Sequence, residues 1–235
     1  MKVSILYTEL ADYSVACLRA LKDCGVELML IHWPINPEAP FKFDLSFFDK
    51  VHSRDSLSDL EMTQLVSEFA PDLILSSGWI DKGYLKVCRS MKDQSVCVLS
   101  LDNHWSGSVK QMVATLISPF TIKRYFHKAF VPGRLQKKYA LKLGFDEGDI
   151  QTGFYSADTS KFQAAFNEVA KSKKDSFPKR FLYLGRYTQH KGIFDLWEAF
   201  LKFRESNQEW ELWCIGTGDQ FDNRLESEGI KHFGF

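Results

Sequence analysis

Short apolar runs alternate along the chain with segments whose apolar residues recur at helical spacing. Between Tyr13 and Cys24 the apolar residues recur at i, i+3, i+4, i+7, i+8 and i+11, which predicts an amphipathic helix. The first 170 residues also contain runs typical of strands, at 3–7, 26–33, 72–76, 95–101, 127–131 and 149–153. Because strands separated by helices form parallel β-α-β units, this alternation predicts a doubly wound α/β domain. The almost uninterrupted apolar run 26–31 fits a strand buried on both faces of its sheet.

The composition changes at 171–180, where five of ten residues are basic and one is proline. Such a segment is typical of a linker or an exposed turn. Beyond it the pattern restarts, with strands expected at 180–184, 210–215 and 231–235 and helices at 193–201 and 220–229. We therefore expect an N-terminal Rossmann-like domain over 1–170, a linker over 171–180, and the first part of a second Rossmann-like domain over 181–235.

Charge and cysteine content exclude several classes of protein. The 235 residues carry 30 Lys and Arg against 30 Asp and Glu, so no overall charge favours nucleic acid. No apolar run is long enough for a membrane span, and the N-terminus lacks the pattern of a signal peptide. The five cysteines are scattered and include no CxxC pair, which argues against disulfides and zinc. We expect a cytoplasmic protein without a metal site.

Two loops carry most of the chemical information. An apolar strand ends at Gly185 and Arg186, and Lys191 and Gly192 open the next helix. Two cations beside the free N–H groups of a helix start suit a diphosphate. The following strand ends in Gly216-Thr-Gly218, where glycines let a ligand approach the backbone. Either loop alone is equally typical of an ordinary strand–helix turn, and only their combination indicates a ligand site.

These segments together resemble glycosyltransferase family 4, whose members are retaining enzymes of the two-domain GT-B architecture. The resemblance rests on the Gly-Arg…Lys-Gly loop, on the Leu-x-x-x-Gly-x-Gly strand and on His-Phe-Gly-Phe235. Upstream, Pro71-Asp-Leu-Ile-Leu75 and the run from Ala129 through Gly153 to Asp158 are similar to the family more diffusely.

The resemblance implies a role for each matching residue. Arg186 and Lys191, with Gly185 and Gly192, would hold the diphosphate of a UDP- or GDP-linked sugar and stabilise the leaving group. Gly216 and Gly218 would line the donor pocket. In the N-terminal half, the loop after the strand at 95–101 carries His104 and Asp102, which would act on the sugar or the acceptor. His104 is as typical of a structural loop residue, and Trp105 as typical of core packing as of stacking on a sugar ring.

Three departures from the family bear on these expectations. The loop Thr8–Tyr13 after the first strand has no glycine where the family usually has two. Residues 154–158 read Phe-Tyr-Ser-Ala-Asp in place of the more usual Asn-Gly-Val-Asp. The family's Glu-x7-Glu pair lies beyond the region that these residues match. We therefore expect either a fragment of a larger enzyme or a non-catalytic, glycan- or partner-binding member.

A further stretch, 103–145, contains no acidic residue and eight cations. They are Lys110, Lys123, Arg124, Lys128, Arg134, Lys137, Lys138 and Lys142. The stretch fits solvated helix faces, or a peripheral contact with an anionic membrane; no motif for nucleic acid accompanies it.

The resemblance thus implies a retaining glycosyltransferase of polysaccharide biosynthesis. It would need no metal and transfer a hexose to a surface-glycan or lipid-linked acceptor. A dehydrogenase is disfavoured because no Gly-x-Gly-x-x-Gly follows the first strand.

Overall fold

A computed structural model of the chain describes residues 1–37, 40–170 and 178–235. It divides into two compact units: the first comprises Met1–Pro34 and Phe43–Asp158, and the second Ile35–Lys42 and Thr159–Phe235. The division lies before Thr159, so the helix that precedes the expected linker groups with the second unit. Most of that linker, 171–177, lies outside the described residues.

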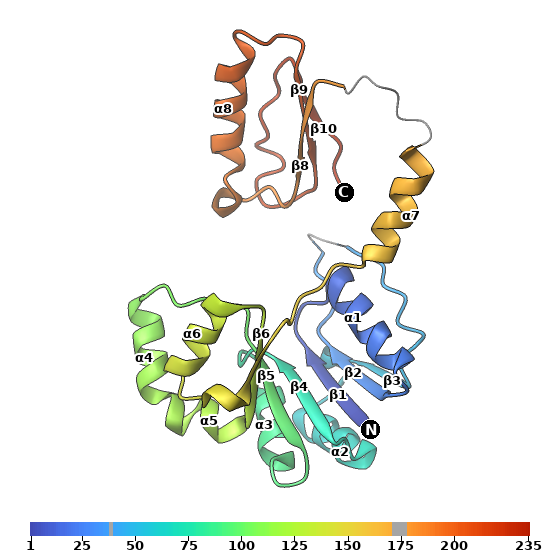
Figure 1. Ribbon diagram of the computed structural model, residues 1–235, viewed down its shortest axis with the longest axis vertical. Coiled ribbons are helices and arrows are strands. Elements are labelled where there is room, and N and C mark those ends of the chain that lie inside the picture. Colours follow the sequence, from blue (N-terminus) through green and yellow to red (C-terminus); the bar gives the residue numbers. More distant parts are fainter. Residues whose placement is uncertain (38–39, 171–177) are drawn as a thin grey trace. The chain divides into compact units, whose positions relative to one another are not determined.

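The first unit is built on a seven-stranded parallel sheet, with the order β3-β2-β1-β4-β5-β6-β7 (Figure 1). Its strands are β1 (Lys2–Tyr7), β2 (Glu27–His32), β3 (Lys50–Ser53), β4 (Leu73–Ser77), β5 (Val96–Ser100), β6 (Lys128–Val131) and β7 (Ile150–Thr152). The predicted doubly wound parallel sheet is confirmed. As the apolar run 26–31 indicates, β2 is buried along Leu28–Ile31. Strand order reverses between β1 and β4, which is where such sheets bind ligands.

Helices cover both faces of this sheet. They are α1 (Asp12–Asp23), α2 (Asp59–Phe69), α3 (Lys82–Met91), α4 (Val109–Ile117), α5 (Ile122–Tyr125) and α6 (Arg134–Lys142), with single turns η1 (Arg54–Ser56), η2 (Ser118–Phe120) and η3 (Glu147–Asp149). The main core cluster joins one sheet face to α2, α3, α5 and α6, while α1 lies in front of the sheet in Figure 1. None of the helices in the described ranges is long and apolar enough to cross a membrane.

Local sequence explains where α2 begins and ends. Ser58 accepts a hydrogen bond from the Glu61 amide while the Glu61 carboxylate accepts one from the Ser58 amide, a capping box. Ala70 then adopts a left-handed conformation, with φ of 50°, directly before Pro71. A proline cannot continue the helix, so the chain turns into β4.

The second unit is built on a three-stranded parallel sheet, with the order β10-β9-β8. Its elements are α7 (Thr159–Ala170), β8 (Arg180–Leu184), η4 (Gln189–Lys191), α8 (Ile193–Arg204), β9 (Glu211–Ile215) and β10 (Ile230–His232). The apolar stripe of α8 packs on one face of the sheet, where Ile193, Trp197 and Phe200 contact Leu212 and Cys214 in one cluster.

The helix expected at 220–229 is wrong. The segment forms turns in which the amides of Phe221, Asn223 and Arg224 bond to carbonyls three residues earlier. It is rich in Asp, Asn, Ser and Gly, whose side chains compete for backbone hydrogen bonds or whose backbone resists helix formation. Phe221 and Leu225 nevertheless pack against the core of the second unit. Their apolar spacing therefore reflects burial without a helix.

Candidate functional site

The loops after β8 and β9 lie side by side at the carboxyl edge of the small sheet. The strands pair in register, with Leu184 opposite Ile215. Pairing continues past their ends, because the Gly185 amide donates to the Ile215 carbonyl at 3.0 Å and the Tyr187 amide to the Thr217 carbonyl at 2.9 Å. The structure therefore brings together the two loops that the sequence singled out.

This close approach explains both glycines of the Gly-x-Gly segment. A Cβ atom at Gly216, where φ is +134°, would overlap the Gly185 carbonyl. A Cβ atom at Gly218 would lie 2.6 Å from the Tyr187 carbonyl oxygen and 2.8 Å from its nitrogen. Only glycine allows the two loops to run in contact. Backbone packing therefore already requires these glycines, and their contact with a donor stays a prediction.

A buried hydrogen-bond chain holds the base of the loops. The Tyr187 ring is fully buried, and its hydroxyl lies 2.9 Å from Nδ1 of His232. His232 Nε2 lies 3.0 Å from the Leu225 carbonyl oxygen, which can only accept, so Nε2 carries the proton and Tyr187 donates to Nδ1. Burial raises the pKa of Tyr187, so its hydroxyl stays protonated and able to donate. These hydrogen bonds connect the first loop, through His232, to the segment 218–230.

The cations lie between Gly185 and the start of α8. Arg186 is half-buried, and the Tyr183 hydroxyl donates to its carbonyl at 2.7 Å, which fixes the loop backbone. Lys191 is exposed at the end of η4 and forms no ion pair among the described residues. Gly192 then takes φ of +70° and precedes the first turn of α8.

Within the described part of the chain, no side chain caps the N-terminus of α8. Its first amide groups are therefore available to an anion, and the helix dipole favours negative charge there. Asp195 lies in this first turn, and its carboxylate oxygen is 3.8 Å from the position of a Cβ atom at Gly192. The sequence analysis did not single out Asp195 or His190, although both lie within or beside the same loop. A bound anion would compete with the Asp195 carboxylate for the first amide groups of α8.

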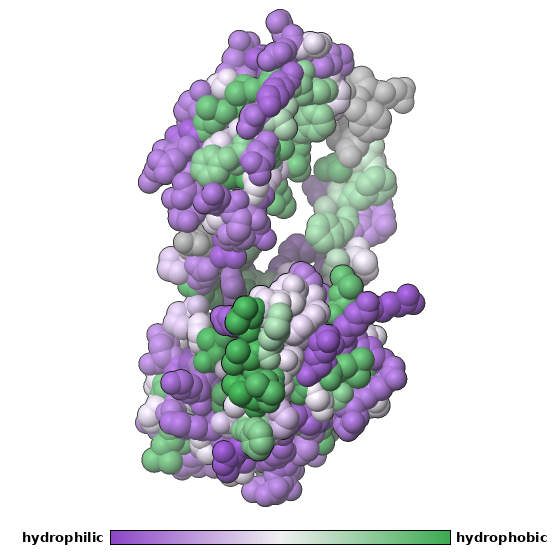
Figure 2. Space-filling view, turned by 90° about the vertical axis from the view of Figure 1, so that its left-hand side faces the viewer, coloured by the Kyte–Doolittle hydropathy of each residue, from purple (hydrophilic) through white to green (hydrophobic). Residues whose placement is uncertain are grey.

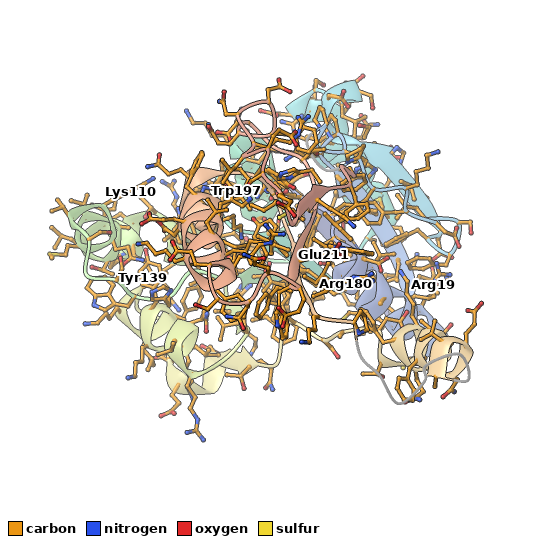
Figure 3. All side chains as sticks on the ribbon, turned by 90° about the horizontal axis from the view of Figure 1, so that it is seen from above. Arg19, Lys110, Tyr139, Arg180, Trp197 and Glu211 are labelled. Carbon is orange, nitrogen blue, oxygen red and sulfur yellow. The ribbon has the colours of Figure 1, made fainter. Side chains whose placement is uncertain are left out.

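At the opposite, amino edge of the small sheet the charges pair with one another. The Glu211 carboxylate lies 2.7 Å from the Lys231 ammonium and 3.1 Å from Arg180 (Figure 3). These hydrogen bonds, led by that from Lys231 and joined by one from the Trp213 indole, lower the pKa of Glu211 to about 2. Cations at this edge are thus neutralised, in contrast to Lys191.

In the first unit, the loops after β1 and β4 meet at the reversal of strand order. The Thr8 amide donates to the Ser77 hydroxyl at 2.7 Å, and the two hydroxyls lie 3.0 Å apart. Thr8 belongs to the loop in which the family resemblance would place glycines, and Ser77 ends β4. Hydrogen bonds between Thr8 and Ser77 therefore join the two loops at the point where the sequence departs from the family.

Asp102 lies among tyrosines at the same carboxyl edge. It follows β5 and accepts a hydrogen bond of 3.2 Å from the hydroxyl of Tyr155, which follows β7. Burial raises the pKa of Tyr155, and the Asp102 charge adds to that effect. Burial likewise raises the pKa of Tyr7 to about 12, with a smaller contribution from Asp102. Tyr13 packs edge-on against Tyr155, with ring centroids 4.9 Å apart.

His104 lies apart from this cluster. Its side chain is exposed, and its carbonyl accepts a bond from Gln111 Nε2 at 2.7 Å. No hydrogen bond or ion pair joins its ring to Asp102 in the described ranges. Trp105 is half-buried against the main core, with the Lys142 ammonium 4.8 Å from its ring centre. Core packing thus accounts for Trp105.

Sequence reasoning missed the partners of Asp102. Tyr155 is 53 residues away, and only the neighbouring positions of β5, β6 and β7 bring it close. The aromatic pair Phe154-Tyr155, placed directly after a strand in the segment that departs from the family, was the available signal.

Comparison with known proteins supports the fold. No family model matches the sequence, and no curated protein matches it either. A glycosyltransferase from Rickettsia africae superposes with a TM-score of 0.63 at 15% identity, over 99% of this chain and 68% of the other. HepE from Anabaena, solved in complex with UDP and glucose, gives 0.63 at 12% identity, over 98% and 69%. UDP-GlcNAc 2-epimerase from Methanocaldococcus jannaschii gives 0.57 at 15% identity, over 100% and 73%.

The chain therefore has a GT-B type fold, with a Rossmann-like parallel sheet in each unit. At these identities the likeness concerns the fold alone. Glycosyltransferases and epimerases are both among the similar structures.

Proposed function

We propose that this chain binds a nucleotide-sugar, UDP- or GDP-linked, through the loop Gly185–Gly192. The observation that carries the proposal is the meeting of Arg186, Lys191 and the uncapped start of α8 in one loop, clamped by backbone bonds to the Gly-x-Gly segment. Charge-assisted hydrogen bonds from both cations, together with free amides, suit a diphosphate. The UDP named in the complex of HepE fits this assignment.

The finer proposal is a retaining, metal-independent hexosyltransferase resembling glycosyltransferase family 4. The bond between the anomeric carbon and the diphosphate oxygen breaks, and the electron pair leaves with the nucleoside diphosphate. The acceptor hydroxyl oxygen bonds to the anomeric carbon on the same face of the sugar, and its proton passes to the departing diphosphate oxygen. Arg186 and Lys191 stabilise the charge that develops on the leaving group, the task a metal ion performs elsewhere.

On the acceptor side we propose Asp102 and His104, in the loop after β5. Tyr155 orients the Asp102 carboxylate through its hydrogen bond. The proposed acceptor is a surface glycan or a lipid-linked glycan, and residues 103–145 would make the peripheral membrane contact. A cytoplasmic location and a part in polysaccharide biosynthesis stay predictions of the same kind.

Calorimetric titration with UDP and with GDP tests the diphosphate site. Replacing Arg186 or Lys191 by alanine should weaken binding by about 1–3 kcal/mol each, the scale of a charged hydrogen bond. The matched control is Lys202→Ala, since Lys202 is an exposed cation of α8 that pairs with Glu198 at 2.7 Å. Equal affinity of all three variants and the wild type would refute the assignment.

The similarity to 2-epimerases favours a second candidate. Incubation with UDP-GlcNAc, followed by proton NMR, separates the two activities. Transfer releases UDP and depends on an acceptor, whereas epimerisation inverts C2 and gives a product whose sugar is still bonded to the diphosphate through its anomeric carbon. Binding of UDP without either reaction would identify the third candidate, a non-catalytic glycan- or partner-binding member of the fold.

A further inference from the structure

Helix α4 presents its apolar stripe to solvent. None of its residues is buried, although its composition is the most apolar among the helices of the first unit. Apolar residues recur at i, i+3, i+4, i+7 and i+8, the spacing of a core-facing stripe. Phe120 in η2 extends the stripe. The exposed fractions of these residues are Val109 75%, Met112 52%, Val113 51%, Leu116 78%, Ile117 44% and Phe120 80%.

Polar contacts define both ends of this helix. Ser108 caps the N-terminus and accepts from the Gln111 amide at 3.4 Å. The Gln111 side chain, directed back along the preceding loop, bonds to the His104 carbonyl and to Ser106. After the last turn, the buried Ser118 hydroxyl donates to the Leu143 carbonyl at 2.6 Å. The Ser118 bond therefore anchors the end of the stripe to the segment that follows α6, while the other bonds join α4 to its own preceding loop.

Exposed cations lie on α4 and on the two helices that follow it. Lys110 lies on α4 itself, at the outer side of its unit in Figure 3, and Arg124, Arg134, Lys138 and Lys142 are exposed on the neighbouring α5 and α6. Residues 103–145 contain no acid. Figure 2 faces the side on which α4 lies in Figure 1 and shows green apolar side chains in its lower half, with purple hydrophilic ones around them.

We propose that α4 and η2 lie in the headgroup region of an anionic lipid bilayer, with the apolar stripe inserted and the exposed cations on the lipid phosphates. An apolar face combined with a basic surround is the chemistry of helices that lie in a membrane interface. Anionic lipids supply the negative charge that this surface lacks.

Charge disfavours two other occupants of the stripe. A second copy of the chain, docked through the same face, would bring the exposed cations of two copies of the stretch 103–145 together, and like charges repel across an interface. A nucleic acid would satisfy the cations through its phosphates but would offer no apolar counterpart to aliphatic side chains such as Leu116 and Val113. A lipid bilayer supplies both an apolar interior and phosphates.

The inference deepens the proposed membrane contact by naming its inserted element. Because α4 follows the Asp102–His104 loop directly, a bilayer held there lies next to the proposed acceptor residues in the chain. The link between the bilayer and the acceptor residues rests on the proposed function. The insertion of α4 does not rest on it, since vesicle binding concerns the first unit and nucleotide binding concerns the second, and each is measured separately.

Co-sedimentation with large vesicles tests the proposal, using the full chain. We expect binding to phosphatidylcholine vesicles that contain phosphatidylglycerol, weak binding to pure phosphatidylcholine, and a decline with salt that reflects the cations. Leu116→Glu should lower partitioning about tenfold, because it removes an inserted apolar group and adds a repelled charge. Lys110→Ala should lower it about fivefold.

The matched control is Leu60→Glu on α2, because Leu60 and Leu116 are both 78% exposed. It should bind vesicles like the wild type. Calorimetry with UDP should give the same affinity for Leu116→Glu as for the wild type, so a failure of nucleotide binding is distinguished from a failure of insertion. Equal vesicle binding by Leu116→Glu and wild type would overturn the proposal. So would a wild-type dimer that Leu116→Glu dissociates without any vesicle binding.

Discussion

Gly218→Ala is the sharpest test of how the two loops of the second unit are joined. The added Cβ atom would lie 2.6 Å from the Tyr187 carbonyl oxygen and 2.8 Å from the Tyr187 nitrogen. Both atoms belong to backbone that is already bonded, since the Tyr187 amide donates to Thr217 and its carbonyl accepts from Gln220. Because the contacted atoms are backbone atoms, no change of side-chain rotamer can relieve the overlap.

The cost follows from two contributions. Overpacking against fixed atoms costs about 1–3 kcal/mol, and φ of +155° adds backbone strain for any residue with a Cβ atom. We expect the second unit to lose about 2–5 kcal/mol of stability. The first unit contains none of these contacts, so its strands should keep their stability.

Hydrogen exchange with mass spectrometry reads the two units separately. Amides of β8 and β9 should exchange about thirtyfold faster or more in Gly218→Ala, while β1 and β2 stay unchanged. Gly148→Ala is the matched control, because a Cβ atom there meets nothing within 4 Å. If the two variants exchange alike in β8 and β9, the close approach is not a constraint. Wild-type protection with lost UDP affinity would instead support the donor-pocket prediction.

Three further changes test other parts of the structure. His232→Phe removes the hydrogen bonds that the buried Tyr187 hydroxyl and the Leu225 carbonyl make to the His232 ring, so thermal unfolding should show the second unit destabilised by about 1–3 kcal/mol. Burial of Asp81 opposes its ionisation, but hydrogen bonds from neighbouring indole, amide and guanidinium groups outweigh it and hold the carboxyl pKa below its usual range. The ionised Asp81 carboxylate therefore stabilises the fold above about pH 4, and this effect is lost as the pH falls through the folded-state pKa. In urea unfolding, the free energy of unfolding of Asp81→Asn should fall less with acid than that of the wild type. Asp195→Asn removes the carboxylate from the first turn of α8 and should tighten UDP binding about two- to fivefold by calorimetry, whereas unchanged affinity would place the anion elsewhere.

Periodicity predicts most strands of the first unit because each is apolar along its length. The short strand β3, Lys50–Ser53, escapes this reasoning since it lies at the sheet edge and reads as polar loop. Val51 is 39% exposed there. An edge strand is defined by its hydrogen bonds to β2, which leave no apolar pattern in the sequence.

The sequence likewise predicts some of the candidate site residues and not others. The sequence places Arg186, Lys191 and their flanking glycines in one loop, because they are close neighbours along the chain. It predicts the Gly-x-Gly segment as a ligand contact, whereas the structure shows that its glycines face another backbone. The partner of Asp102 could not be predicted, since Tyr155 reaches it only through the order of β5, β6 and β7.

Helix α4 shows a deeper limit of periodicity. Apolar spacing identifies the residues that share one face of a helix, but it does not say whether that face meets the core. In α8 the same spacing is buried, with Trp197 at 3% exposure, whereas in α4 Leu116 is 78% exposed. The neighbouring charges separate the two cases, since α8 carries Asp195 and Glu198 while 103–145 carries no acid. An apolar stripe in an acid-free, cation-rich stretch is thus the pattern that indicates an outward face for anionic lipid, and vesicle binding by Leu116→Glu decides whether that rule holds here.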